Sequence, residues 1–311
     1  MQQFFLLRKI YIMNRVFYFI LISCCCSVDL NAQVADTSIV VVKTTDTPVA
    51  VVTAGVSKSN EKMSVYKIKP WVDIPVTVAF ATYTIYGMSV IYGRDKVPEA
   101  EILALNRNDV NSFDRPVTYN YSTKANSNSD IFFYGSMPLP LVLLLDKNIR
   151  KDGLKVGLLF FEAMGTTGVL YTSSAMIANR FRPYAYNPDA PIGARTSGNI
   201  KNSFFAGHPA LVATATFFTA KVFSDYHPNM KNKWILYTIA GGAATATGLF
   251  RMQGGYHFRT DVIVGVTVGS LVGILIPHLH KNKTFATAKL RLLPNFGNGS
   301  SGFTLLYKPG K

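Results

Sequence analysis

The chain has 311 residues, of which 49% are hydrophobic and only 16% are charged, and its formal net charge is +15. Soluble domains carry about a quarter of charged residues, so the low charge and the mean hydropathy of +0.19 point to a membrane protein. No basic stripe is interleaved with exposed aromatic residues, so we expect no nucleic-acid partner. The three cysteines are consecutive, at 24–26, which excludes a disulfide framework and a cysteine-based zinc site.

Residues 1–32 have the pattern of a signal peptide. Basic residues precede a short apolar run, and Leu30 and Ala32 form a permissive cleavage site. Two alternatives stay open: a lipoprotein signal with lipidation at Cys24, and an uncleaved anchor. Residues 33–70 read as a polar extracytoplasmic or linker segment, for which paired strands and a disordered linker both fit.

Residues 71–280 are predicted to form the membrane domain. We expect an all-α fold, a membrane-embedded helical bundle of about six segments with short N-terminal and C-terminal non-helical extensions. Residues 94–130 read as a polar loop, and the basic tail, 281–311, is a candidate β-hairpin. The six apolar segments are 71–93, 131–145, 155–178, 207–223, 234–250 and 261–279.

Glu162 lies inside the third apolar segment. An ionisable group at that depth usually faces the bundle interior and marks either a functional site or a structural pair. The sequence offers no visible partner, so both interpretations stay open.

A short loop between the fifth and sixth segments carries three chemically active side chains. It contains Arg251, His257 and Asp261 in the stretch GLFRMQGGYHFRTDVIVG. Arginine binds phosphate oxygens in a fork, histidine attacks or shuttles protons near neutral pH, and aspartate can fix one histidine tautomer. A loop that only joins two apolar helices needs no such trio.

Two upstream loops hold complementary groups. ANRFRPYAYN contains Arg180 and Arg182, and NSFFAGHPA places Gly207 and His208 at the start of the fourth segment. A helix N-terminus offers free N–H groups and a positive dipole end to an anion. If segments three to six alternate across the bilayer, these loops and the 248–265 loop emerge on one face.

Together, these stretches resemble the three signature motifs of the type 2 phosphatidic acid phosphatase and vanadium haloperoxidase superfamily. The motifs are R-P, then G-H at a helix start, then R-x5-H-x3-D, and the resemblance covers roughly residues 156–279. It implies a helical-bundle core that hydrolyses a phosphomonoester or diphosphate without a metal or other cofactor.

The resemblance also implies roles for individual residues. His257 would be the nucleophile, forming a phosphohistidine, and Asp261 would orient it. His208 would be the general acid for the leaving group. Arg182 and Arg251 would clamp the phosphate.

The first motif departs from the family pattern. The family has a lysine seven residues before the motif's arginine, and this chain has Ala175 there. Arg180 is the candidate that replaces the missing charge.

The second and third motifs lack hydroxyl donors. Phe205 and Ala206 stand where the family has Pro-Ser, and Phe250 replaces the serine before the third-motif arginine. The backbone N–H groups of Ala206 and Gly207 remain as expected donors. Because one lost donor of this kind costs about a hundredfold or more in rate, we expect reduced or altered catalysis.

The first functional hypothesis is an integral membrane phosphatase that acts on a lipid phosphate or lipid diphosphate. Its partners are then the lipid bilayer and a phosphate-bearing lipid, and the sequence leaves the oligomeric state open. The alternative is a degenerate, non-catalytic membrane protein that binds anionic head groups. A third hypothesis, a vanadate-dependent haloperoxidase, shares the pocket.

Two features of the sequence predict opposite orientations of the motif loops across the membrane. Loops 147–155 and 224–233 and the tail are basic, so the positive-inside rule places them in the cytoplasm and the motif loops on the other side. A cleaved signal followed by six spans gives the reverse. The two predicted orientations agree if segment 71–93 or 131–145 does not fully cross the membrane, or if the signal peptide is not used. We predict a bacterial-type inner-membrane protein whose site faces the periplasm.

Overall fold

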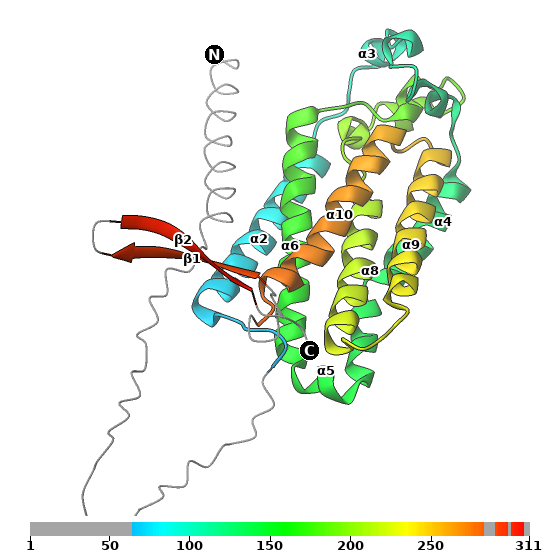
Figure 1. Ribbon diagram of the computed structural model, residues 1–311. Helices are drawn as coiled ribbons and strands as arrows, with labels where there is room; N and C mark the ends of the chain where they lie inside the picture. The colour runs from blue at the N-terminus through cyan, green and yellow to red at the C-terminus, as the bar shows by residue number, and fades with distance from the viewer. Residues whose placement is uncertain (1–63, 283–289, 298–299, 308–311) are drawn as a thin grey trace, which may run out of the picture. The chain divides into compact units, whose positions relative to one another are not determined.

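The computed structural model describes residues 64–282, 290–297 and 300–307; the predicted signal lies outside these residues. In the described part, long helices run alternately up and down to form a bundle (Figure 1). The prediction of an all-α bundle of about six segments is confirmed. The long helices are α2 (Pro70–Tyr92), α4 (Thr123–Ser136), α6 (Gly153–Ala178), α8 (Gly207–Tyr226), α9 (Lys233–Gln253) and α10 (Arg259–Leu279).

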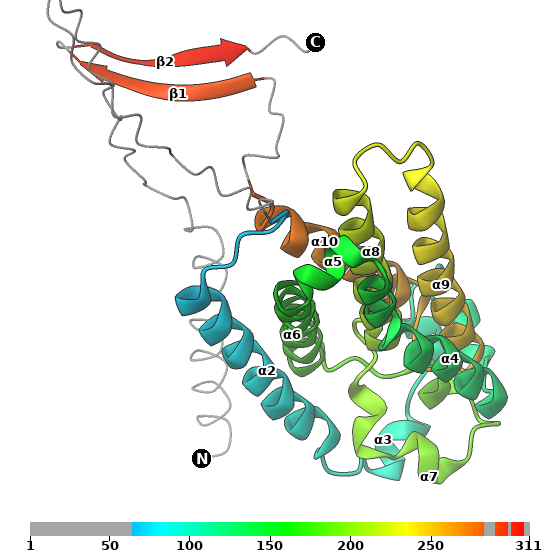
Figure 2. The same cartoon turned by 90° about the horizontal axis from the view of Figure 1, so that it is seen from below.

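Short elements connect the long helices, several of them gathered at the end where α6 and α9 finish (Figure 2). In the tail, two strands pair in an antiparallel register from Leu290↔Tyr307 to Gly297↔Ser300. The short helices are α3 (Glu99–Leu103), η1 (Arg107–Asp109), η2 (Arg115–Tyr119), η3 (Leu139–Leu145), α5 (Lys147–Lys151), η4 (Pro183–Tyr186), α7 (Ile192–Arg195) and η5 (Gly198–Lys201), and the strands are β1 (Leu290–Gly297) and β2 (Ser300–Tyr307).

The second segment begins earlier than predicted. Helix α4 starts at Thr123, inside the stretch expected to be a polar loop, because the Ser122 hydroxyl accepts a hydrogen bond from the Ala125 N–H and caps the helix. Its first turns are polar although they belong to an apolar span of 23 residues that runs from Thr123 to Leu145. The polar turns therefore need an interior partner, which the motif residues supply.

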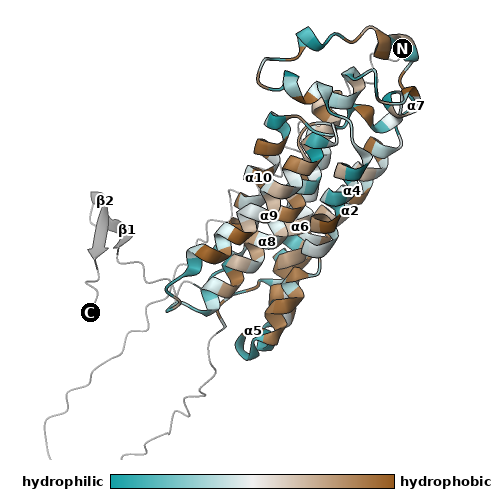
Figure 3. Cartoon of the chain, turned by 90° about the vertical axis from the view of Figure 1, so that its right-hand side faces the viewer, coloured by the Kyte–Doolittle hydropathy of each residue, from teal (hydrophilic) through white to brown (hydrophobic). Residues whose placement is uncertain are grey.

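The outer surface of the bundle is apolar. Four helical stretches within the described residues are long and apolar enough to cross a membrane. Figure 3 shows hydrophobic colour along the helix bodies and hydrophilic colour gathered at the ends. An apolar belt on a bundle whose backbone groups are internally bonded is the surface that a bilayer covers. The stretches are 70–92, 123–145, 153–186 and 259–279, and the exposed apolar side chains of the bundle include Trp71, Ile85, Leu154, Phe161, Ile239 and Leu271.

A glycine stripe brings α8 and α10 into backbone contact. Gly265, Gly269 and Gly273 recur every fourth residue, so they lie on one face of α10. A Cβ at Gly269 would stand 2.0 Å from the Ala210 carbonyl oxygen, and one at Gly265 would stand 2.5 Å from that of Ala206. Small residues permit this approach between membrane helices. The stripe fixes the starts of α8 and α10, and with them two motifs, close together.

At the opposite end of the bundle, buried charges are paired. The Asp225 carboxylate accepts hydrogen bonds from the Tyr66 hydroxyl at 2.9 Å and the Lys281 ammonium at 2.8 Å, and it also pairs with Lys221. Backbone bonds between residues 65–67 and 280–282 join the entry and the exit of the bundle at this end. We call Tyr66, Lys221, Asp225 and Lys281 the base cluster.

Glu162 belongs to the same end of the bundle. Its Oε2 lies 3.7 Å from His280 Nε2, and the same nitrogen lies 3.5 Å from Asp73 Oδ1. Of the two interpretations that the sequence left open, this geometry favours structural pairing, because the partner is an interior imidazole at a helix end.

Candidate active site

The three predicted motifs meet at the end of the bundle where α6 and α9 finish and where α8 and α10 begin. The Ala206 N–H donates to the Asp261 carbonyl oxygen at 3.0 Å, which joins the second motif to the third. The Tyr184 N–H donates to the Gly255 carbonyl oxygen at 3.0 Å, which joins the first motif to the third. Gly255 adopts a φ of 76°, and a Cβ there would stand 2.3 Å from the Asn120 carbonyl oxygen, so this turn requires glycine.

His257 occupies the loop between α9 and α10 with 1% of its surface exposed. Its Nδ1 lies 2.7 Å from the Ser203 carbonyl oxygen. A carbonyl oxygen only accepts hydrogen bonds, so Nδ1 carries the proton and Nε2 presents its lone pair. Burial lowers the pKa of His257 well below its usual value of 6.5, and the charges of Arg251 and Arg182 lower it further. The imidazole is therefore neutral near pH 7, as a nucleophile requires.

Asp261 reaches His257 through Ser203. Its Oδ2 accepts hydrogen bonds from the Ser203 hydroxyl at 2.6 Å and from the Phe258 N–H at 2.9 Å. The His257 ring is thus held by the Ser203 carbonyl, while the Asp261 carboxylate holds the hydroxyl of the same serine. Asp261 sits in the first turn of α10, where its carboxylate caps the helix.

Arg180 bridges two buried carboxylates. Its guanidinium lies 2.5 Å from Asp261 Oδ1 and 2.8 Å from Asp114 Oδ2, and it stacks over the Phe258 ring at 4.1 Å. Its charge is thus neutralised by the protein. We expect Arg180 to position Asp261 rather than to replace the missing lysine at Ala175.

Asp114 anchors the loop before η2 to this network. Burial raises the pKa of Asp114, but hydrogen bonds from Thr260, Asn111 and Arg180 outweigh burial and hold the pKa below its usual value. The carboxylate therefore stays ionised. It accepts from the Thr260 N–H at 3.0 Å and from the Thr260 hydroxyl at 2.6 Å. This loop thereby fixes the first turn of α10 next to His257.

Arg182 and Arg251 are the uncompensated charges of the site. They are 3% and 4% exposed, respectively. Their guanidinium carbons lie 5.0 Å and 4.4 Å from the centroid of the Tyr256 ring, so both face one small region. Within the described residues neither arginine forms an ion pair with a carboxylate: Arg182 donates to the Asn199 carbonyl oxygen, and Arg251 donates to the Asn126 side chain. Burying a guanidinium without an anion is costly, so we expect the pair to bind an anion.

His208 lies at the start of α8, with its side chain 29% exposed. The Phe133 ring lies 4.5 Å away, centroid to centroid, and the Asp130 carboxylate lies 3.7 Å from Nε2. Arg182 and Arg251 are both within electrostatic reach of this imidazole. His257 is also within electrostatic reach of His208.

The amide donors of the second motif differ from expectation. The Ala206 N–H is occupied by the Asp261 carbonyl oxygen, so Gly207 is the remaining donor of the two that were predicted. The ring of Tyr171 packs closely on Gly207: a Cβ there would lie 2.8 Å from Tyr171 Cε2. Glycine at this position is therefore required by packing.

Sequence reasoning missed several residues around the site. Asn126 and Asp130 were assigned to a loop, although their spacing of four residues places them on one helix face. Ser203 precedes Gly207 of the second motif by four residues and carries no motif of its own. Only a contact across the fold identifies Asp114 as part of the site.

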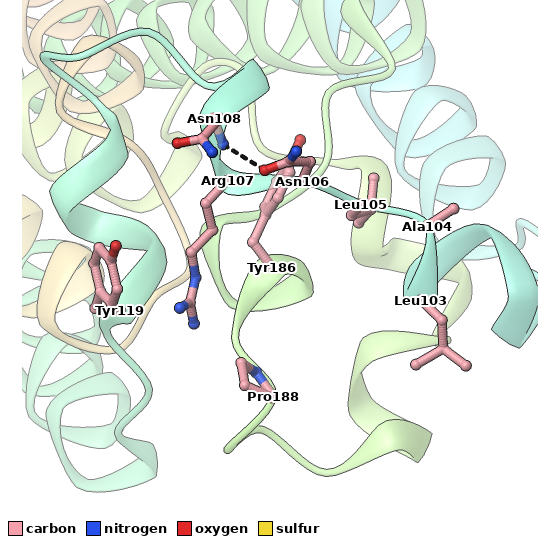
Figure 4. Close-up of a pocket in the computed structure, with 9 residues that line it drawn as sticks. All are labelled: Leu103, Ala104, Leu105, Asn106, Arg107, Asn108, Tyr119, Tyr186 and Pro188. Carbon is pink, nitrogen blue, oxygen red and sulfur yellow. Dashed lines mark hydrogen bonds between the residues drawn. The ribbon is translucent and has the colours of Figure 1, made fainter.

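A hollow lies beside η1 and η4, and its lining residue Tyr186 has its ring centroid 6.4 Å from that of Phe258. It has a volume of about 560 Å³ and is drawn in Figure 4. None of the predicted site residues lines it. The lining residues are Leu103, Ala104, Leu105, Asn106, Arg107, Asn108, Tyr119, Tyr186 and Pro188.

The PAP2 superfamily model matches residues 156–285 of the chain. The resemblance drawn from the three motifs is thereby confirmed. The match is confined to this stretch, which is less than half of the chain. The PAP2 match begins within α6 and takes in α8, α9 and α10, whereas α4, with Asn126 and Asp130, precedes it.

Among solved structures, the chain is similar to the first transmembrane PAP2 type phosphatidylglycerolphosphate phosphatase from Bacillus subtilis. The sequence identity is 20%, the TM-score is 0.41, and the likeness covers 67% of this chain and 94% of that chain. Comparison with curated proteins finds no match.

Proposed function

We propose that the protein is an integral membrane phosphatase that hydrolyses a lipid phosphate or lipid diphosphate through a phosphohistidine on His257. One observation carries this proposal: two buried guanidinium groups without carboxylate partners face the region that holds two imidazoles. A phosphate group is the anion that matches this set, because arginine forks bind its oxygens and an imidazole can attack its phosphorus.

In the first step, His257 Nε2 attacks the phosphorus while the bond to the leaving oxygen breaks. The Ser203 carbonyl oxygen holds Nδ1–H and stabilises the positive charge that develops on the ring. Arg182 and Arg251 bind the equatorial oxygens, where the negative charge is spread in the transition state. His208 gives its proton to the leaving oxygen and becomes neutral.

In the second step, water attacks the phosphohistidine. Neutral His208 takes a proton from the water as its oxygen bonds to phosphorus. The N–P bond breaks, and inorganic phosphate leaves with the neutral His257 ring restored. Both steps need positive charge at the phosphoryl oxygens, and the two guanidiniums supply it, so we expect turnover without an added metal ion.

The location of the site supports a lipid substrate. It lies at one end of the apolar bundle, beside the apolar span that contains α4. Phe133 of α4 packs on His208, and the ring centroids of Phe132 and Phe250 lie 6.0 Å apart, so aromatic groups border the site. A phosphate at the membrane surface can then bind while its hydrocarbon part remains in the bilayer.

We further propose that the site faces the periplasm. The base cluster and the short basic loops before α6 and α9 lie at the other end of the bundle, which the positive-inside rule assigns to the cytoplasm. Reporter fusions after Lys147 and after Lys233 test this orientation. Extracytoplasmic signals at both positions would contradict it.

Phosphate release decides the proposed function. The protein, purified in lipid nanodiscs, is given phosphatidate, phosphatidylglycerol phosphate, undecaprenyl diphosphate and lipid A phosphate, each with and without EDTA. We expect release from at least one substrate in the presence of EDTA. We expect His257→Ala to reduce it by about a thousandfold or more, because no other group replaces the nucleophile.

His227→Ala is the matched control. This histidine lies at the other end of the bundle, 3.2 Å from Asp146, and should leave turnover unchanged. Trapping with radiolabelled phosphate should give an acid-labile, alkali-stable adduct in the wild type and none in His257→Ala. Phosphate or lipid binding without turnover by the wild type would instead identify a non-catalytic head-group binder, the reading that the missing lysine and serines motivate.

A further inference from the structure

One face of α4 lines the site. Asn126, Asp130 and Phe133 are spaced by four and three residues, so they lie together on the helix surface. Asn126 accepts a hydrogen bond from Arg251, and Phe133 packs on His208. Helix α4 precedes the PAP2 match, so its contribution is a feature of this chain outside the matched stretch.

Asp130 is the acidic member of this face. Its Oδ1 lies 3.7 Å from His208 Nε2, and the side chains are 34% and 29% exposed, respectively. At this distance opposite charges attract without a full hydrogen bond, and partial exposure moderates the attraction. The carboxylate therefore favours the protonated form of His208.

Burial of the His208 imidazole acts in the opposite direction, and so do the other charges around it. Arg251 from α9 and Arg182 from the segment before η4 disfavour an imidazolium, and His257 faces it from the α9–α10 loop. From α6, the Tyr171 ring packs on the neighbouring Gly207. The carboxylate at the start of α10, Asp261, is bonded to Arg180 and Ser203. Among the described residues, Asp130 is thus the carboxylate that pairs with His208.

We propose that Asp130 is a positioning residue that keeps His208 protonated in the substrate complex. A bound phosphate cancels the charge of the two arginines, and Asp130 then supplies the attraction that holds the proton on the imidazole. When the P–O bond breaks, that proton moves to the leaving oxygen, and Asp130 takes no part in the transfer. This inference rests on the proposed function and adds a residue to it.

The first test is the pH dependence of kcat at saturating substrate, which reports groups in the enzyme–substrate complex. In Asp130→Asn, we expect the basic limb of the profile to move down by about one pH unit, because the imidazolium loses a charge partner within 4 Å. Asp130→Glu should restore most of the shift. Asp189→Asn, which removes an exposed charge in the loop after η4, should leave the limb in place.

Two outcomes would overturn the inference. In one, Asp130→Asn has the wild-type profile. In the other, its activity falls by the same factor at every pH, which would mean that Asp130 only shapes the pocket.

A second measurement needs no turnover. Nuclear magnetic resonance follows the imidazole titration in protein saturated with inorganic phosphate, and His208→Gln identifies the signal. Asp130→Asn should lower the titration midpoint of His208 by about one unit. If the wild type fails to release phosphate but this midpoint moves, the proposed function fails and the pairing stands. If the midpoint stays fixed, the pairing fails.

Discussion

The two ends of the bundle carry similar side chains in opposite electrostatic states. In the base cluster the carboxylate of Asp225 has bonded partners in Tyr66, Lys221 and Lys281. At the site end, no carboxylate of the described residues lies within ion-pair distance of Arg182 or Arg251, although both are nearly inaccessible and Asp130 acts on Arg251 electrostatically. Both ends lie where helices finish, so position in the fold does not distinguish them.

The difference separates stabilising charges from functional ones. A buried ion contributes little net stability even when paired, and it costs several kcal/mol when it is unpaired. Unpaired buried cations therefore persist where an external anion completes them. On this argument, substitutions at the site end should change activity more than stability, and substitutions at the base cluster should do the reverse.

Arg251→Ala should have the largest effect on activity. Removing one fixed donor to the phosphoryl oxygens should lower kcat by about 10²–10³-fold. The free energy of unfolding should change by no more than about 1 kcal/mol, because the deleted charge had no ion-pair partner. Phosphate release and thermal unfolding in the same nanodiscs measure both quantities.

Arg259→Ala is the control for that variant. Its guanidinium stacks over Phe113 at 5.4 Å at the same end of the bundle, and we interpret it as an interfacial charge. Equal losses of activity in both variants would show that general positive charge, rather than the Arg182–Arg251 pair, attracts the substrate.

Asp225→Ala should produce the reverse pattern at the base cluster. Two lysines and a tyrosine lose their shared partner, so we expect about 3 kcal/mol of destabilisation with unchanged turnover per folded molecule. Replacing Lys221 by Met together with Asp225 by Leu should recover much of the loss. A drop in kcat without a drop in melting temperature would contradict the division between the two ends.

Local sequence signals predicted much of this architecture. Apolar runs located the long helices, and motif spacing selected His208, Arg182, Arg251 and His257 as candidate site residues, because these signals are contained in neighbouring residues. The predicted start of the second segment was wrong, because a polar stretch in a membrane protein normally indicates a loop. In this protein the polar stretch is helical, and the polar face of α4 is turned toward the site.

Contacts between residues far apart in the sequence could not be predicted from local patterns. The bond from His257 to the Ser203 carbonyl and the pairing of Arg180 with Asp114 join residues 54 and 66 positions apart. A backbone carbonyl carries no residue-type signal, so the tautomer of His257 could not be assigned from the sequence. Spacing could place Asp261 near His257 but could not show which atoms it bonds.

In the pH profile of kcat/KM, the acidic limb should lie well below pH 6.5, because the pKa of His257 is lowered in the folded protein. Arg251→Met removes one cause of that shift, so its limb should move to higher pH. The unfolded chain protonates this imidazole near 6.5 and the folded chain does not, so stability should fall as the pH drops below 6.5. Activity profiles and melting temperatures between pH 4.5 and 8 test both effects; an acidic limb at 6.5 in both proteins would refute the electrostatic coupling.

The smallest expected effect is a gain in stability and in activity. Ala206 is the N-cap of α8 and has no side-chain hydrogen bond to the helix. Ala206→Ser should add a capping acceptor worth about 1 kcal/mol of stability, and its hydroxyl should offer the phosphate a donor that the motif lacks. We expect a higher melting temperature and a several-fold higher kcat, while Ala206→Gly, which adds no hydroxyl, should leave kcat unchanged. A more stable Ala206→Ser protein with unchanged kcat would mean that the hydroxyl caps α8 without reaching the phosphate. Position 206 would then contribute to stability alone, while His208, two residues later, contributes to activity.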